Sequence, residues 1–259
     1  MFKPFDLTGK VALVTGGNGG IGLGMAEALG QAGADLCIWG TNAAKNAAAK
    51  ARLAKTGRKV EALAVDVSDE ADAEAGMAET VKRLGRVDAC FANAGVTGRA
   101  KSMFDIDAKE WRRLLAVNLD GAFFTLRAAA RHMVARAEKG DSGGRLVGIA
   151  SLAARSGAAR NQHYAATKGG LVAVVKAMAV ELARYGITAN AILPGWIETE
   201  MTAATFANEK FRANVLPRVP LRRWGKPEDF AGIAVYLASA ASAFHTGDEI
   251  LIDGGYWVF

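Results

Sequence analysis

Short apolar runs of strand type recur along the whole chain, and a longer stretch with helical spacing separates each run from the next. The runs are Val11–Thr15, Leu36–Trp39, Val60–Val65, Ala89–Ala92, Leu146–Ser151, Thr188–Leu193 and Glu249–Ile252. Strands that alternate with helices form parallel β-α-β units with right-handed crossovers. This alternation predicts an α/β fold with a doubly wound parallel sheet of about seven strands, flanked by helices on both faces.

The length and composition indicate one domain. The chain has 259 residues, of which 51% are hydrophobic, and this is enough apolar surface for one large core. No Pro/Ser-rich linker, charge block, low-complexity tract or internal repeat divides the sequence. We therefore expect residues 1–259 to fold as a single domain.

A glycine-rich turn follows the first apolar run. The sequence Thr15-Gly16-Gly17-Asn18-Gly19-Gly20-Ile21-Gly22 leads directly into a helix-type run that starts at Leu23. Glycines let the backbone approach a pyrophosphate closely, and the free N–H groups of a helix start favour its negative charge. The strand–turn–helix context predicts a dinucleotide site, and the alternative is a flexible loop without a ligand.

Tyr164 and Lys168 stand four residues apart at the start of an apolar helical segment, Ala165 to Leu182. Residues at this spacing share one helix face. An ammonium beside a phenol favours the phenolate, so the pKa of the tyrosine is expected to fall below its usual ~10. Such a tyrosine can exchange a proton with an alcohol. Ser151, upstream, strengthens the motif, although Ser151 could instead cap a strand and Lys168 could be a solvated surface cation.

Residues of these motifs share one position relative to the predicted strands. Each lies at or just beyond a carboxyl end, where ligands of doubly wound sheets bind. These residues are Gly16, Gly20, Gly22, Asn93, Ser151 and Pro194. We expect them to converge on one crevice.

With these motifs, the chain resembles a single-domain short-chain dehydrogenase/reductase from about Leu7 to Gly255. The matching positions are Thr15, Gly16, Gly20 and Gly22, Asn93-Ala94-Gly95, Asn118, Ser151, Tyr164 and Lys168, Pro194-Gly195 with Ile197 and Thr199, and Asp253-Gly254-Gly255. The resemblance implies a Rossmann-like fold and an NAD(P)-dependent oxidoreductase that interconverts a secondary alcohol and a ketone by hydride transfer.

The resemblance also assigns roles. Tyr164 would act as general acid and base, and Ser151 would orient the substrate oxygen. Lys168 would hold the ribose hydroxyls and lower the pKa of Tyr164, and Asn118 would help to hold a water linked to Lys168. The implied cofactor contacts are Gly16, Asn18, Gly19, Gly20, Ile21, Gly22, Thr41, Asn42, Asp66, Val67, Asn93, Ala94, Gly95, Tyr164, Lys168, Pro194, Gly195, Ile197 and Thr199. Asp66 could equally be a turn residue.

The end of the second strand normally decides between the two coenzymes. A carboxylate there binds the adenosine ribose and repels a 2′-phosphate, whereas an arginine accepts the phosphate. Here Gly40 stands at the acidic position and Thr41 at the basic one, with Lys45 one helical turn away. The sequence departs from both patterns, and we expect NAD, with NADP as the alternative.

The segment around residues 198–220 corresponds to a mobile substrate lid in the family. A cyclic or polyhydroxy alcohol, a sugar acid or a 3-oxoacyl group would suit the pocket, and no residue discriminates among them. The helical stretches 107–139 (broken or bent somewhere) and 162–185 have faces rich in small residues, and the family pairs these helices between subunits. We therefore expect a homotetramer, with the aromatic end Tyr256–Phe259 buried at a subunit contact or a pocket wall.

Other classes of function are disfavoured by composition. The net charge is +6, but the basic residues are dispersed, which argues against nucleic-acid binding. No apolar stretch could span a membrane, and the first residues lack a signal-peptide pattern, which predicts a cytoplasmic protein. Cys37 and Cys90 fall in predicted strands, as buried thiols without metal-ligand partners. A catalytically silent dinucleotide sensor and a non-redox enzyme on the same fold remain as alternatives.

Overall fold

The structure, a computed structural model, describes residues 3–98 and 100–259. Its centre is one seven-stranded sheet in the order β3-β2-β1-β4-β5-β6-β7, and every neighbouring pair is parallel. The strands are β1 (Val11–Thr15), β2 (Asp35–Trp39), β3 (Val60–Leu63), β4 (Ala89–Ala92), β5 (Gly144–Ile149), β6 (Ile187–Pro194) and β7 (Glu249–Ile252). The predicted doubly wound sheet is confirmed.

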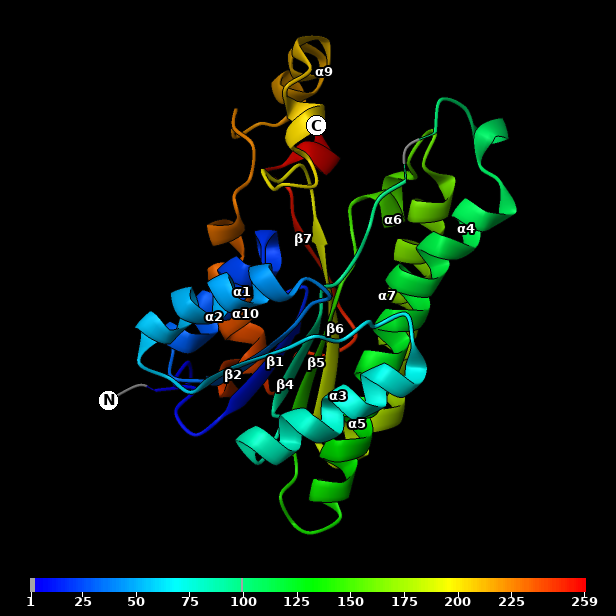
Figure 1. Ribbon diagram of the computed structural model, residues 1–259. Coiled ribbons are helices and arrows are strands. Elements are labelled where there is room, and N and C mark those ends of the chain that lie inside the picture. The colour runs from blue at the N-terminus through cyan, green and yellow to red at the C-terminus, as the bar shows by residue number, and fades with distance from the viewer. Residues whose placement is uncertain (1–2, 99) are drawn as a thin grey trace.

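Helices cover both faces of this sheet (Figure 1). One face carries α1 (Gly20–Gln31), α2 (Ala43–Leu53) and α10 (Ala231–Ala238), and the other carries α3 (Glu70–Leu84), α5 (Gly121–Ala137) and α7 (Gln162–Leu182). Each layer encloses its own apolar core against the sheet. Short 3₁₀ turns comprise Ala54–Thr56, Met103–Asp105, Ala183–Tyr185, Leu216–Arg218, Pro227–Phe230, Ala240–Ser242 and Tyr256–Val258.

The strand order reverses between β1 and β4. The chain first builds outward from β1 through β2 to β3, and then returns to place β4 on the opposite side of β1. Such a reversal opens a crevice at the carboxyl ends of the two strands. Thr15 and Asn93, which end and follow these strands, therefore lie together at this crevice.

The predicted helix over residues 107–139 is broken, as expected. It consists of α4 (Ala108–Leu115), a π-turn η3 (Ala116–Asp120) and α5. In the π-turn, the N–H of Gly121 donates to the carbonyl of Ala116, five residues earlier. Asp107 caps α4 by accepting a hydrogen bond from the N–H of Glu110 at 2.7 Å. Turns of this kind are uncommon and often lie at functional sites.

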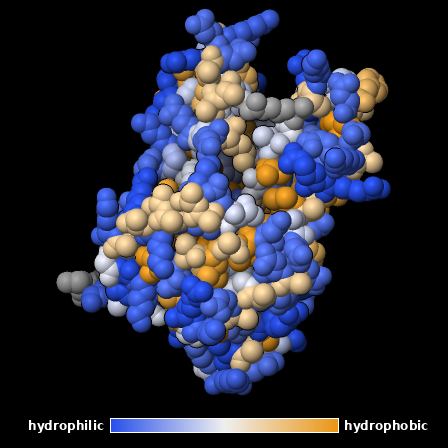
Figure 2. All heavy atoms as spheres, in the orientation of Figure 1, coloured by the Kyte–Doolittle hydropathy of each residue, from blue (hydrophilic) through white to orange (hydrophobic). Residues whose placement is uncertain are grey.

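The residues after β6 project beyond the sheet and contain α8 (Ala203–Phe206) and α9 (Glu209–Val215). Opposite them, α4, α6 (Ala153–Ser156) and the beginning of α7 form a second projection (Figure 1). The space-filling view shows a notch between the two projections (Figure 2). Five rings of the first projection make contact with one another, and we call them the aromatic cluster: Trp196, Phe206, Phe211, Trp224 and Tyr256.

Three further expectations concern the cysteines, the C-terminal segment and membrane-spanning helices. Cys37 and Cys90 are buried free thiols, as predicted, and burial raises the pKa of Cys37 to about 11. At the C-terminus, Trp257, Val258 and Phe259 are exposed in the single chain, so their burial in a subunit contact stays a prediction. Within residues 3–98 and 100–259, no helix is both long and apolar enough for a membrane crossing.

Candidate active site

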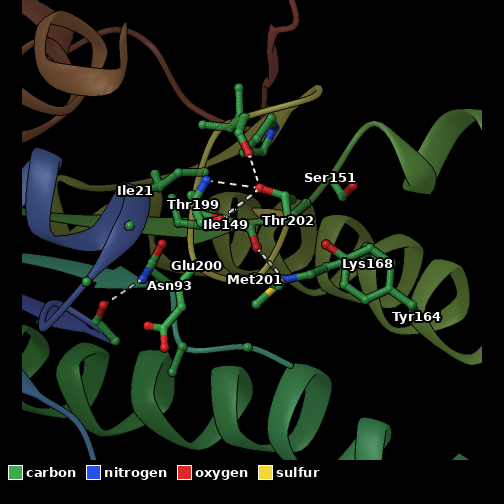
Figure 3. Close-up of a pocket in the computed structure, with 18 of the residues that line it drawn as sticks. Ile21, Asn93, Ile149, Ser151, Tyr164, Lys168, Thr199, Glu200, Met201 and Thr202 are labelled. Carbon is green, nitrogen blue, oxygen red and sulfur yellow. Dashed lines mark hydrogen bonds between the residues drawn. The ribbon is translucent and has the colours of Figure 1, made fainter. Parts of the chain in front are cut away.

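A cavity of about 540 Å³ opens at the carboxyl ends of the central strands. Its walls come from the glycine turn after β1, the loop after β4, the ends of β5 and β6, α7, and the first residues of the segment 198–220. Of the six residues predicted to converge on one crevice, all except Gly22 line this cavity, and Figure 3 shows side chains from several of these segments around it.

The glycine turn forms a cradle that side chains would fill. Gly16 has a positive φ of 62°, and a Cβ on it would lie 3.1 Å from Cα of Ala94. A Cβ on Gly22 would lie 2.5 Å from the carbonyl oxygen of Gly16. At Gly19, the N-cap of α1, no side chain caps the free N–H groups of the helix. A pyrophosphate can approach this side-chain-free backbone closely and accept hydrogen bonds from the free N–H groups, so the turn fits a dinucleotide.

Thr15 joins the glycine turn to the loop after β4. Its Oγ1 accepts hydrogen bonds from the backbone N–H groups of Asn93 and Ala94, both at 3.0 Å. In return, Nδ2 of Asn93 donates to the carbonyl of Thr15 at 2.9 Å. The two backbone segments that would flank a coenzyme are thus fixed relative to each other.

Asn118 fixes the other end of the same loop from within the π-turn. The side chain is fully buried, with Oδ1 accepting from the N–H of Val96 and Nδ2 donating to its carbonyl, both at 2.8 Å. Nδ2 also lies 3.4 Å from Oγ1 of Thr167 on α7. Asn118 therefore lies outside the cavity lining and positions the loop, and its role in holding a water stays a prediction.

Ser151, Tyr164 and Lys168 gather at one end of the cavity (Figure 3). Tyr164 and Lys168 share one face of α7, with Nζ of the lysine 5.7 Å from the phenol ring centroid. Nζ donates to the carbonyl of Ile149 at 2.7 Å. Ser151 follows β5, and its Oγ accepts from the N–H of Ala153 at 3.1 Å. The three polar groups can therefore surround one oxygen atom of a ligand.

The pKa values of the two α7 groups reflect burial. Desolvation raises the pKa of Tyr164 above 10, although the Ser151 hydroxyl opposes this by hydrogen bonding to the phenol. Desolvation lowers the pKa of Lys168 to about 8. The sequence predicted a lowered pKa for Tyr164, and that direction is wrong. The reason is that the lysine ammonium is directed at the Ile149 carbonyl, so burial dominates.

Most of the predicted cofactor contacts line the cavity. These are Gly16, Asn18, Gly19, Gly20, Ile21, Asn93, Ala94, Gly95, Tyr164, Lys168, Pro194, Gly195, Ile197 and Thr199. The predicted residues outside this lining are Gly22, Thr41, Asn42, Asp66 and Val67, together with Asn118.

Two of the residues outside the lining have their side chains engaged elsewhere. Oδ1 of Asn42 caps α2 by accepting from the N–H of Lys45, and Oδ1 of Asp66 accepts from the N–H of Ser68. This bond gives Asp66 a role within its own loop, and its contact with a cofactor stays a prediction.

Several lining residues were not predicted as contacts, namely Lys45, Ile149, Ala150, Glu200, Met201 and Thr202. Most of these residues adjoin predicted ones in the sequence: Ile149 and Ala150 precede Ser151, and Glu200, Met201 and Thr202 follow Thr199. Lys45 has no such neighbour. Oγ1 of Thr202 donates to the carbonyl of Ile197 at 2.6 Å and accepts from the N–H of Thr199 at 2.9 Å. This hydroxyl thereby fixes the turn in which the segment 198–220 begins.

Comparison with known proteins agrees with this geometry. Residues 16–257 match the family model described as enoyl-(acyl carrier protein) reductase. The chain is 35% identical over 254 residues to gluconate 5-dehydrogenase of Gluconobacter oxydans, covering 98% of this chain and 97% of that protein. It is also 35% identical over 249 residues to a 3-oxoacyl-acyl-carrier-protein reductase of Chlamydia pneumoniae, covering 96% of this chain and 97% of that protein.

Several of the similar solved structures contain NADP, and one of these also contains tartrate. The gluconate 5-dehydrogenase from Burkholderia cenocepacia, in complex with NADP and tartrate, superposes with a TM-score of 0.93. It is 36% identical to this chain, and the match covers 99% of this chain and 98% of that one.

Proposed function

The chain belongs to the short-chain dehydrogenase/reductase family, as an NAD(P)-dependent oxidoreductase acting on CH–OH groups, and from this premise we propose that it interconverts a secondary alcohol and a ketone with Tyr164 as general acid and base. The observation that carries the proposal is the gathering of Ser151, Tyr164 and Lys168 around one end of the cavity. Intact proton-transfer groups at this place favour an enzyme over a silent dinucleotide sensor.

In the oxidative direction, the phenol oxygen of Tyr164, as phenolate, takes the proton from the substrate hydroxyl. Ser151 holds the substrate oxygen, because its Oγ is oriented by the N–H of Ala153 and remains able to donate. The charge of Lys168, with Nζ 5.7 Å from the phenol ring centroid, would favour the phenolate against the burial that raises the pKa of Tyr164. Its remaining donors would bind ribose hydroxyls. The nicotinamide, when bound, supplies the hydride acceptor or donor. In the reductive direction the proton passes from Tyr164 to the carbonyl oxygen.

For the coenzyme we propose NAD as the preferred form, with NADP accepted. Gly16, Gly19 and Gly20 would hold the pyrophosphate, while Pro194, Gly195 and Ile197 would flank the nicotinamide. Support for the NAD preference comes from Thr41, which stands where an arginine would bind the 2′-phosphate. The Burkholderia cenocepacia relative binds NADP, so acceptance of both forms is expected.

We propose a sugar acid or a related polyhydroxy acid as substrate. The support is similarity along the full chain to gluconate 5-dehydrogenases. The residues 198–220 would form the lid over the substrate, because their first residues already line the cavity. A homotetramer in the cytoplasm completes the proposal, and the exposed apolar side chains of Trp111, Phe123 and Val180 on α4, α5 and α7 support an assembled state.

The experiment that tests this function is coenzyme-linked absorbance with NAD(H) and NADP(H) against sugar acids, polyols, cyclic ketones and 3-oxoacyl esters. We expect turnover with sugar acids. Tyr164→Phe is expected to lose at least about 100-fold of that rate while still binding coenzyme, because general acid–base catalysis contributes this much.

The possible results separate the alternatives. Turnover by Tyr164→Phe at the wild-type rate would contradict its role as acid and base. Coenzyme binding without turnover of any substrate would favour the sensor. A rate restricted to 3-oxoacyl esters would replace the sugar-acid assignment while retaining the reaction class.

A further inference from the structure

An ion pair bridges two walls of the cavity beside the glycine turn. Lys45, in the first turn of α2, places Nζ 2.6 Å from Oε2 of Glu200 in the segment 198–220. The two residues are 155 positions apart, and both line the cavity. Among the described lining residues, the other charged side chain is Lys168, which is buried next to Tyr164. Lys45 is therefore the lining cation available on the α2 side of the cavity.

The end of β2 carries neutral groups where a discriminating charge would stand. Nδ2 of Asn18 donates to Oδ1 of Asn46 at 2.7 Å, and Nδ2 of Asn46 donates to the carbonyl of Gly40 at 2.8 Å. A Cβ on Gly40 would lie 2.3 Å from Nδ2 of Asn18, so this amide pair fills the space that a side chain at position 40 would need. An amide pair neither repels a 2′-phosphate as a carboxylate does nor pairs with it as a cation does.

The Lys45–Glu200 pair can be displaced by a stronger anion. Exposed ion pairs are weak, and the side chains of Lys45 and Glu200 are 48% and 82% exposed. A phosphate has more charge and more acceptor oxygens than a carboxylate. The backbone that carries Glu200 is held beside the glycine turn, because the hydroxyl of Thr202 bonds the carbonyl of Ile197 and the N–H of Thr199. An anion approaching Lys45 therefore competes with a tethered carboxylate.

We propose that Glu200 is a specificity-determining residue for the coenzyme, because by pairing with Lys45 it competes with the 2′-phosphate of NADP and lowers the affinity for NADP relative to NAD. This inference rests on the proposed dehydrogenase function and deepens it. Coenzyme choice is then set jointly by α2 and by the segment over the substrate, rather than by an acidic residue at the end of β2.

The test measures dissociation constants of NADH and NADPH by fluorescence titration, without substrate. Glu200→Gln is expected to tighten NADPH binding about threefold to fivefold relative to NADH, the size of an exposed ion pair. Lys45→Ala is expected to weaken NADPH about tenfold, since it removes a charge-assisted contact, and to change NADH much less. In the double variant, the gain from Glu200→Gln should disappear.

The matched control is Glu198→Gln, which removes the same charge two residues away. Glu198 is exposed, lies outside the cavity lining and makes no ion pair with any residue of 3–98 or 100–259. Equal shifts of the NADPH to NADH ratio in Glu198→Gln and Glu200→Gln would overturn the inference, as would a gain that persists in the double variant. A wild-type protein that binds neither coenzyme would instead contradict the proposed function itself.

Discussion

The two walls of the cavity are held by different forces. On one side, the loop after β4 is fixed by directional hydrogen bonds from buried side chains, Thr15 at its beginning and Asn118 at Val96. On the other side, the segment with α8 and α9 contributes Phe206 and Phe211 to the aromatic cluster, in which Phe206 and Trp224 stack with ring centroids 4.3 Å apart. Hydrogen bonds demand one geometry, whereas ring packing tolerates several. We therefore expect the first wall to keep one shape, whereas the second can adopt several.

The largest expected effect is on the free energy of unfolding, and it is tested by replacing one asparagine with alanine in each wall. Asn118→Ala removes a buried amide and leaves the N–H and carbonyl of the half-buried Val96 without their partners, so we expect a loss of about 3 kcal/mol in the free energy of unfolding. The control is Asn208→Ala, which removes the exposed cap that accepts from the N–H of Phe211 and should cost about 1 kcal/mol. Urea denaturation measures both, and equal losses would remove the distinction between the walls.

A second prediction concerns the pH dependence of stability that comes from Lys168, the buried lysine of α7. The pKa of Lys168 is lowered to about 8 in the folded chain and is about 10.4 when unfolded, so the unfolded state binds more protons between these values. Wild-type stability should therefore rise by about 2 kcal/mol from pH 8 to pH 10, relative to Lys168→Met. Parallel denaturant titrations at the two pH values check this. If the stability of wild type and of Lys168→Met depended on pH in the same way, burial of Lys168 would not lower its pKa as described.

Much of this architecture follows from sequence pattern, but the contacts between distant side chains do not. The strands follow from local apolar runs, and each observed end lies within two residues of its predicted position. The pairing of Lys45 with Glu200 has no such signal, because it depends on where two separate loops meet in space. The sequence predicted a helix over 107–139 that is broken or bent somewhere, but neither the position of the break nor its π geometry at Ala116–Asp120.

A third, smaller effect addresses the aromatic wall. Phe206→Ala removes a ring stacked on Trp224, and aromatic pairs contribute about 1 kcal/mol, so we expect only a modest loss of stability. The Michaelis constant for the substrate should change more than the dissociation constant for NADH. Steady-state kinetics and fluorescence titration compare the two, and a larger change in coenzyme binding would place this wall with the cofactor instead.

The smallest expected effect on the fold is that of deleting residues 256–259. Tyr256 makes an edge contact with Trp196 and an exposed hydrogen bond with Arg218, and Trp257, Val258 and Phe259 are exposed. The free energy of unfolding of the monomer should therefore change by only about 1 kcal/mol. If the tail lies at a subunit contact, light scattering of the shortened chain will report a smaller assembly. An unchanged mass would contradict that assignment.

The π-turn between α4 and α5 also determines the rotational phase of Asn118. An α-helix advances about 100° per residue, so one residue more or fewer rotates everything before the change relative to everything after it. Without the additional residue of the π-turn, α4 and α5 would form one regular helix. The amide of Asn118 could then not face Val96 while α5 kept its packing against the sheet. The length of this turn, rather than the choice of asparagine alone, thus brings the amide into register with the loop.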